Sequence, residues 1–158
     1  MLAKLPPLEK VFEAWSAIAS GRTKIDDSSD EASGAASVVS SNREKTYHVE
    51  WNGGVYKSDD NATWWQKYPG YPILAVLMLQ GKLPYDAELA RRFENIDWNA
   101  LNAREKGDYA KALKSAFADL DLSPEIAARA KEEAEKTIEI LKSLDIEARR
   151  WVKKRPRQ

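Results

Sequence analysis

The chain has 158 residues, of which 43% are hydrophobic and 32% are charged, and it contains no cysteine. The 25 basic and 25 acidic side chains cancel, so no overall field attracts the chain to nucleic acid or to an anionic membrane. The absence of cysteine excludes disulfides, thiolate metal sites and cysteine nucleophiles. We expect one soluble domain over residues 1–158, and a cytoplasmic location because the N-terminus lacks a signal-peptide pattern.

The first predicted element is an amphipathic helix from Leu8 to Ser20, whose apolar residues recur at three- and four-residue steps and which ends at Gly21. Residues 23–36 follow, and their Asp, Ser, Ala and Gly content predicts a mobile acidic loop. Four carboxylates lie within residues 26–31, but the alternating Asp and central Gly of a calcium-binding EF-hand loop are missing. We therefore expect a solvated loop.

Strands are predicted next, over residues 36–41, 46–51 and 55–57. In the second strand Tyr47, Val49 and Trp51 alternate with polar residues, which indicates one buried face. Residues 52–54, Asn-Gly-Gly, can adopt the positive φ values of a tight hairpin. The prediction is a three-stranded antiparallel meander that packs on a helix, because so small a sheet needs a partner to be stable.

Residues 60–84 hold the most apolar stretch of the chain. Asp60 or Asn61 can cap a short helix that carries Trp64 and Trp65. Pro72 can start a second helix, in which residues 73–79 have no polar side chain on any face. Such a helix is buried in protein, since a bilayer span needs about 20 apolar residues. We expect this helix at the centre of the core.

Three further helices are predicted in the second half. Asp86 caps the first, over residues 86–95, and the second spans residues 103–119, with a capping box at Asn102 and Glu105. The last begins at Ser123 and, if unbroken to Arg155, would be about 48 Å long in a domain about 40 Å across; otherwise we expect a bend at Asp145 and Ile146. The predicted fold class is α+β: mostly helical, with about five helices around one buried hydrophobic helix, a small meander and a long C-terminal amphipathic helix.

The last helix carries the clearest pattern in the chain, a heptad-like seam of small and apolar residues. Such a seam suits a helical partner, either the N-terminal helix or the same helix of a second copy. Our first hypothesis is therefore a non-catalytic intracellular interaction or regulatory module that forms a homo-oligomer, most simply a dimer. Its interface would be Ala127, Ala130, Ala134, Leu141, Leu144 and Trp151.

The second hypothesis is binding of nucleic acid or an anionic surface by the basic tail, residues 149–158. Basic side chains can contact phosphates, and a tryptophan can stack on a base. Basic residues at a helix C-terminus also complement the helix dipole, so nucleic acid is possible but not favoured. The tail residues concerned are Arg149, Arg150, Trp151, Lys153, Lys154, Arg155 and Arg157.

The third hypothesis is a small-molecule binder or enzyme built on Trp64, Trp65, Tyr68 and Tyr71, because aromatic rings give large contact areas and polar tips; core packing is the alternative. His48, the only histidine, lies near Glu50 on one strand face and is a candidate ligand-binding residue. No nucleophile motif or second histidine accompanies it. We expect no metal, no cofactor, no membrane partner and, on balance, no catalysis.

Overall fold

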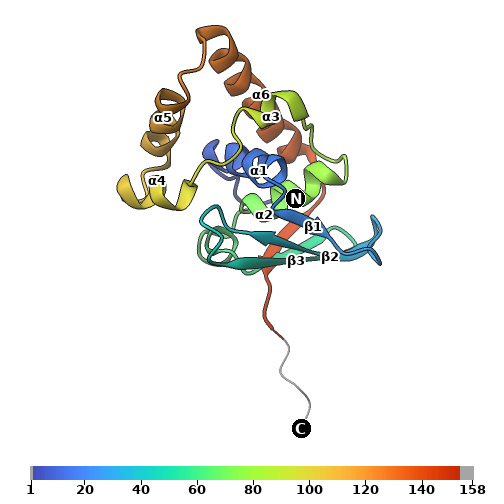
Figure 1. Ribbon diagram of the computed structural model, residues 1–158. Helices are drawn as coiled ribbons and strands as arrows, with labels where there is room; N and C mark the ends of the chain where they lie inside the picture. The colour runs from blue at the N-terminus through green and yellow to red at the C-terminus, as the bar shows by residue number, and fades with distance from the viewer. Residues whose placement is uncertain (1, 154–158) are drawn as a thin grey trace.

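A computed structural model describes residues 2–153 and shows an α+β architecture, as predicted. The helices lie on one face of a single sheet (Figure 1), and the other face of the sheet carries no helix in the described part of the chain. The described residues form six α-helices, one π-helix and five strands, where about five helices and three strands were predicted. The fold class is therefore confirmed, while the details differ.

The sheet contains the predicted meander at its centre and one additional strand at each edge. The strand order is β1-β2-β3-β4-β5, with antiparallel neighbours except for β5, which runs parallel to β4. In β3, Val49 and Trp51 are buried beneath the helices, whereas His48 and Glu50 are exposed on the other face. The strands are β1 Thr23–Ile25, β2 Ser33–Val39, β3 Thr46–Asn52, β4 Val55–Ser58 and β5 Glu147–Arg150.

The acidic loop predicted over residues 23–36 is shorter in the structure, because β1 and β2 occupy its two ends. The connection that remains is closed by Asp30, whose carboxylate accepts the backbone N–H groups of Ala32 and Ser33. The indole of Trp51 donates to the Asp30 carbonyl at 2.8 Å. These contacts were not visible in the composition of the stretch, which contains few apolar residues to mark strands.

Two helices, not one, form the buried centre. Helix α2 (Tyr71–Leu79) is buried from residue 72 to 78 and contacts strands β1 to β4, as the apolar stretch predicted. Helix α1 (Glu9–Ala19) is buried from residue 9 to 17 and packs against α2. The amphipathic pattern of α1 predicted a solvent-exposed polar side, and its burial is the main departure from the predicted core.

A helix was predicted over residues 103–119 after a connection, and the structure instead has two helices in this region, α4 (Trp98–Arg104) and α5 (Tyr109–Leu120). Positive φ values at Lys106 (55°) and Gly107 (80°) interrupt the chain between them. The predicted capping box is wrong, since α4 and α5 are capped by Asp97 and Asp108 instead. Asp86 caps α3 (Ala87–Arg91) as predicted, by accepting the Leu89 N–H at 3.1 Å.

Helix α6 (Pro124–Ser143) begins at the predicted cap, where Ser123 accepts the Ile126 N–H at 3.3 Å, but it does not continue to Arg155. The chain leaves the helix at Leu144, buries Ile146 and adds β5 to the edge of the sheet. In this strand the backbone N–H of Glu147 donates a hydrogen bond to the Gly54 carbonyl at 3.0 Å. Helix α6 itself has 20 residues and is therefore about 30 Å long, which fits within the domain.

The seam of α6 packs mainly on its own chain. Ala130, Ala134 and Leu141 are fully buried in the single chain, and α6 contacts α1. Ala127 and Leu144 are half-buried, and Trp151 lies beyond β5, where its ring stacks on His48. The six residues predicted as an oligomer interface therefore do not share one exposed helix face, while the formation of an oligomer stays a prediction.

Candidate functional site: a buried polar cavity

A cavity of about 210 Å³ lies between the sheet and the helices, enough for about seven water molecules. Its walls come from α1, β3, the start of the π-helix η1 (Ala62–Gln66), α2, α4 and the start of α5. Three of its lining residues are exposed and mark its opening to solvent. The lining residues are Lys10, Glu13, Tyr47, Asp60, Asn61, Ala62, Tyr71, Asn99, Asn102, Gly107 and Tyr109, of which Asn61, Asn99 and Gly107 are the exposed ones.

Helix α1 brings three charged side chains into the protein beside this cavity. Glu9, Lys10 and Glu13 are only 1%, 6% and 3% exposed. The opposite side of the same helix carries Val11, Phe12 and Trp15, which belong to the hydrophobic core. Charged side chains are rarely buried unless they are paired or functional, so this group of three is the most unusual feature of the fold.

Lys10 and Glu13 form a buried ion pair, with 2.9 Å between Nζ and Oε2. The Lys10 ammonium also lies 4.3 Å from the centre of the Tyr109 ring, and the Asn102 amide donates to Glu13 Oε1 at 3.1 Å. Burial is the largest effect on the pKa of Lys10 and lowers it, but Glu13, Glu9 and Tyr109 together outweigh burial and raise this pKa. Glu13 Oε2 is thus partnered by Lys10, and Oε1 by Asn102.

Glu9 lies one turn before Glu13 on the same helix. Its carboxyl group is buried beside the side chains of Glu13 and Asn102. Burial, together with the negative charge of Glu13, raises the pKa of Glu9 to about 9. At neutral pH Glu9 is therefore an uncharged acid.

Asp60 forms part of the opposite wall, and its role is structural. Its carboxylate accepts hydrogen bonds from the Ser58 hydroxyl (2.6 Å), the Thr63 hydroxyl (2.8 Å) and the Thr63 N–H (3.1 Å). Burial raises the pKa of Asp60, and these hydrogen bonds oppose the rise. Its Oδ2 would lie 1.9 Å from a Cβ atom on Gly70, so only glycine fits there. The predicted cap of the short helix is thereby confirmed for Asp60.

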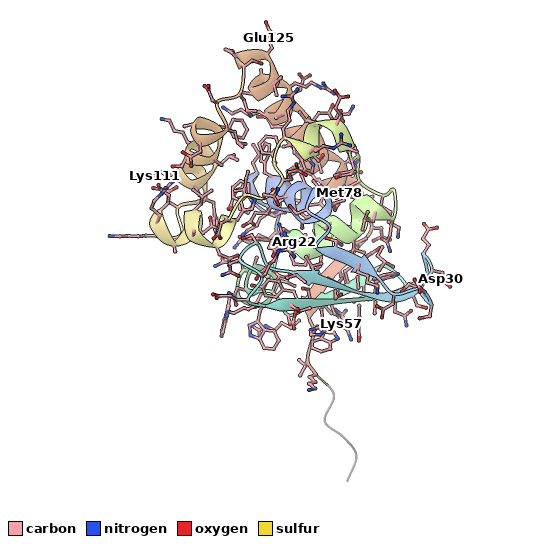
Figure 2. All side chains as sticks on the ribbon, in the orientation of Figure 1. Arg22, Asp30, Lys57, Met78, Lys111 and Glu125 are labelled. Atoms are coloured by element: carbon pink, nitrogen blue, oxygen red, sulfur yellow. The ribbon has the colours of Figure 1, made fainter. Side chains whose placement is uncertain are left out.

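Two phenols and a guanidinium group complete the polar surroundings. The rings of Tyr47 and Tyr71 meet edge to face, 6.2 Å apart, and burial raises the pKa of both hydroxyls. Arg22, which lies between the sheet and the helices (Figure 2), donates to the Val39 carbonyl at 2.6 Å. Burial lowers the pKa of Arg22, and the nearby Tyr71 and Glu13 oppose this effect only in part. Both phenols are thus neutral donors.

The structure separates the aromatic residues that were predicted to form one ligand site. Only Tyr71 lines the cavity. Tyr68 is buried, which raises its pKa to about 12, and the Lys4 ammonium lies over its ring. Trp64 and Trp65 point elsewhere, and the Arg150 guanidinium packs 5.0 Å and 5.8 Å from the centres of their rings.

His48 pairs with Asp59 and not with Glu50, its predicted neighbour. Its Nδ1 lies 2.9 Å from Asp59 Oδ2, and its backbone N–H donates to Asp59 Oδ1 at 2.7 Å. The imidazole stacks on Trp151, with 4.5 Å between ring centres and 16° between planes. These groups lie on the exposed face of the sheet, away from the cavity.

Of the basic tail, the structure describes residues 149–153. Arg149 forms an ion pair with Glu147, and Arg150 donates to the Trp64 carbonyl at 2.8 Å. Lys153 is exposed. Lys154, Arg155 and Arg157 lie outside the described residues.

Sequence reasoning missed Glu9, Lys10, Glu13, Asn102 and Tyr109. The polar positions of α1 have the spacing of an ordinary solvent-exposed side, and Asn102 resembled a helix cap. A weak signal was present, because two glutamates one turn apart flank a lysine in a helix that precedes the core. Only the fold shows that α4 and α5 cover this side of α1.

Residues 2–153 contain no group of three or more His, Cys, Asp or Glu side chains placed to hold a metal ion. Over the same residues, no helix combines the length and apolar character needed to cross a membrane.

The fold and the site together define an α+β protein with a buried polar cavity beside its first helix. The chain belongs to the family described as Uncharacterised conserved protein UCP014422, which matches residues 3–147. All residues that line the cavity lie within this matched stretch, whereas Arg149 to Trp151 lie beyond it. Searches of curated proteins and of solved structures found no match.

Proposed function

We propose that this protein binds a small, uncharged polar molecule in the cavity, with Glu13 as its main contact. The observation that carries the proposal is the buried Lys10–Glu13 ion pair, because both of its side chains line the polar cavity. A carboxylate can accept several hydrogen bonds, so a ligand that donates one to Glu13 would add to those from Lys10 and Asn102.

The charges around the cavity favour a ligand without net charge. Lys10 and Glu13 neutralise each other, and Glu9 is protonated at neutral pH. Asp60 already accepts three hydrogen bonds from its own neighbours. A charged ligand would lose its hydration without gaining a free counter-charge, which is unfavourable.

The remaining lining groups suit hydroxyl or amide groups on the ligand. Tyr47 and Tyr71 offer phenol hydroxyls, and Asn61, Asn99 and Asn102 offer amides. The side-chain oxygen of Asn102, Oδ1, is a buried acceptor without a hydrogen bond. A few placed polar groups in a small pocket are the usual basis of specificity for small polar ligands.

General acid–base catalysis is a second candidate function, favoured by Glu9, whose pKa burial raises to about 9 one turn from Glu13. Two carboxyl groups whose environments separate their pKa values can act as acid and base in one reaction. Glu13 lines the cavity and would accept a proton from the ligand. Glu9 does not line it, so it would act through Glu13 as a proton donor.

Saturation-transfer NMR with four small probes tests the binding proposal: acetamide, a monosaccharide, acetate and methylammonium. We expect saturation transfer to acetamide and the monosaccharide, and none to acetate or methylammonium. Glu13→Gln should abolish the transfer, because a neutral amide cannot replace the carboxylate beside Lys10. Glu135→Gln on the exposed side of α6 is the matched control and should behave as the wild type. Equal transfer with Glu13→Gln, or transfer only to the charged probes, would contradict the proposal.

A further inference from the structure

The face of the sheet opposite the helices forms a second, separate surface. Side chains from three neighbouring strands lie in one row there, because Glu50 is paired with Lys57 and Lys57 with Arg149. Figure 2 shows Lys57 on this face. The row borders a hollow of about 450 Å³, whose other walls include the small residues Ser33 and Gly34. This hollow shares no lining residue with the buried cavity.

An aromatic pair lies on the same face, two residues further along the strands, formed by His48 and Trp151. The His48 imidazole and the Trp151 indole stack in parallel at 4.5 Å, and His48 is held from the side by Asp59. Trp151 is fixed by its backbone N–H, which donates to the Ser58 carbonyl at 3.0 Å. The indole is only half-buried, so a further planar ring can join the stack.

Arg150, the residue before Trp151, contacts two further aromatic side chains at the edge of the sheet. Arg150 packs on Trp64 and on Trp65, whose side chain is 69% exposed. The exposed indole of Trp65 therefore lies beside the positive charge of Arg150 and is accessible to a partner. Two consecutive residues of the C-terminal strand region thus each contact an aromatic side chain from elsewhere in the chain.

The charges of the described surface are slightly positive. Lys57, Arg149, Arg150 and Lys153 are exposed, and the carboxylates around them are Glu50, Asp59 and Glu147. Glu147 pairs with Arg149 and Asp59 pairs with His48, so Lys57 and Lys153 are the basic groups most available to an anionic partner.

We propose that this outer face, formed by His48, Lys57, Arg149 and Trp151, binds single-stranded nucleic acid. Bases would stack on the Trp151 indole, and Lys57 and Arg149 would contact the phosphates. Proteins that bind single strands combine such stacking rings with a basic track along the backbone. Over residues 2–153 the face is an open sheet from which no helix projects toward a duplex groove, so unpaired bases fit it better than a double helix.

Fluorescence anisotropy of a labelled 12-nucleotide single strand, titrated with the full chain at several salt concentrations, tests this proposal. Trp151→Leu keeps an apolar side chain but removes the ring, and it should weaken binding about 10-fold. Trp151→Phe should restore most of the affinity, which a merely structural role of the indole would not predict. Circular dichroism and the melting temperature of each variant verify that it is folded.

Lys57→Gln combined with Arg149→Gln should weaken binding of all sequences similarly. It should also reduce the slope of log Kobs against log salt concentration by about 1.4, since each contact to a single strand contributes about 0.7. Arg91→Gln with Arg92→Gln on and after α3 is the matched control, because both are exposed on the helical side. Glu13→Gln should bind the strand as the wild type does, which separates this surface from the cavity.

Three results would overturn the proposal. The first is no binding at low salt. The second is a Trp151→Leu variant that is folded and binds as tightly as the wild type. The third is equal binding to duplex DNA or to vesicles of anionic lipid, which would indicate a general polyanion surface instead of a site for unpaired bases.

Discussion

Replacing Lys10 by methionine tests whether α1 carries a buried ion pair. Methionine has a similar length and shape but no charge, so Glu13 would be left buried without its counter-charge. Lys10 and Glu13 are 6% and 3% exposed, so solvent screens the pair little. Removal of one partner of such a pair costs about 3–5 kcal/mol of unfolding free energy. We expect a loss of this size at pH 8, measured by urea denaturation with an unchanged m-value.

The double variant Lys10→Met with Glu13→Leu removes both charges and should recover most of the stability, because apolar replacement of a buried pair is often neutral or stabilising. A single variant that loses less than about 1 kcal/mol, the range of exposed pairs, would refute burial of the pair. A double variant less stable than the single one would do the same.

Three further predictions concern Glu9, Gly70 and Leu141. Between pH 4.5 and about 9 the folded chain keeps a proton on Glu9 that the unfolded chain has lost, so stability falls as the pH rises through this window. At pH 7 Glu9→Gln should raise the free energy of unfolding by about 3 kcal/mol, and it should make this free energy, measured with urea, less dependent on pH. An unchanged pH dependence would contradict a protonated Glu9 in the folded chain. Gly70→Ala should destabilise by about 1–3 kcal/mol or more in thermal unfolding, because its Cβ would lie 1.9 Å from the Asp60 carboxylate, and a variant as stable as the wild type would refute this contact. Leu141→Ala should cost about 2–5 kcal/mol independently of protein concentration, since the side chain is buried in its own chain, whereas a concentration-dependent loss would show that α6 contributes to a dimer.

Patterns between near neighbours in the chain determined most of the elements. The period-two alternation of Tyr47, Val49 and Trp51 predicted β3, and the uninterrupted apolar run after Pro72 predicted α2 as a buried helix. Asp86 and Ser123 marked the starts of α3 and α6 correctly. These signals are readable because propensity, capping and hydrophobic period depend on residues within a few positions of one another.

The edge strands and the site depended on contacts between distant parts of the chain. Strand β5 pairs with β4 across about 90 residues, and its sequence continues the pattern of the helix before it, so only the free sheet edge distinguishes strand from helix there. Likewise, Glu9, Lys10 and Glu13 have the spacing of a solvent-exposed helix side. They became a buried site because α4 and α5 return over α1, and burial, which no local pattern records, is what changes the pKa of Glu9 and pairs Lys10 with Glu13.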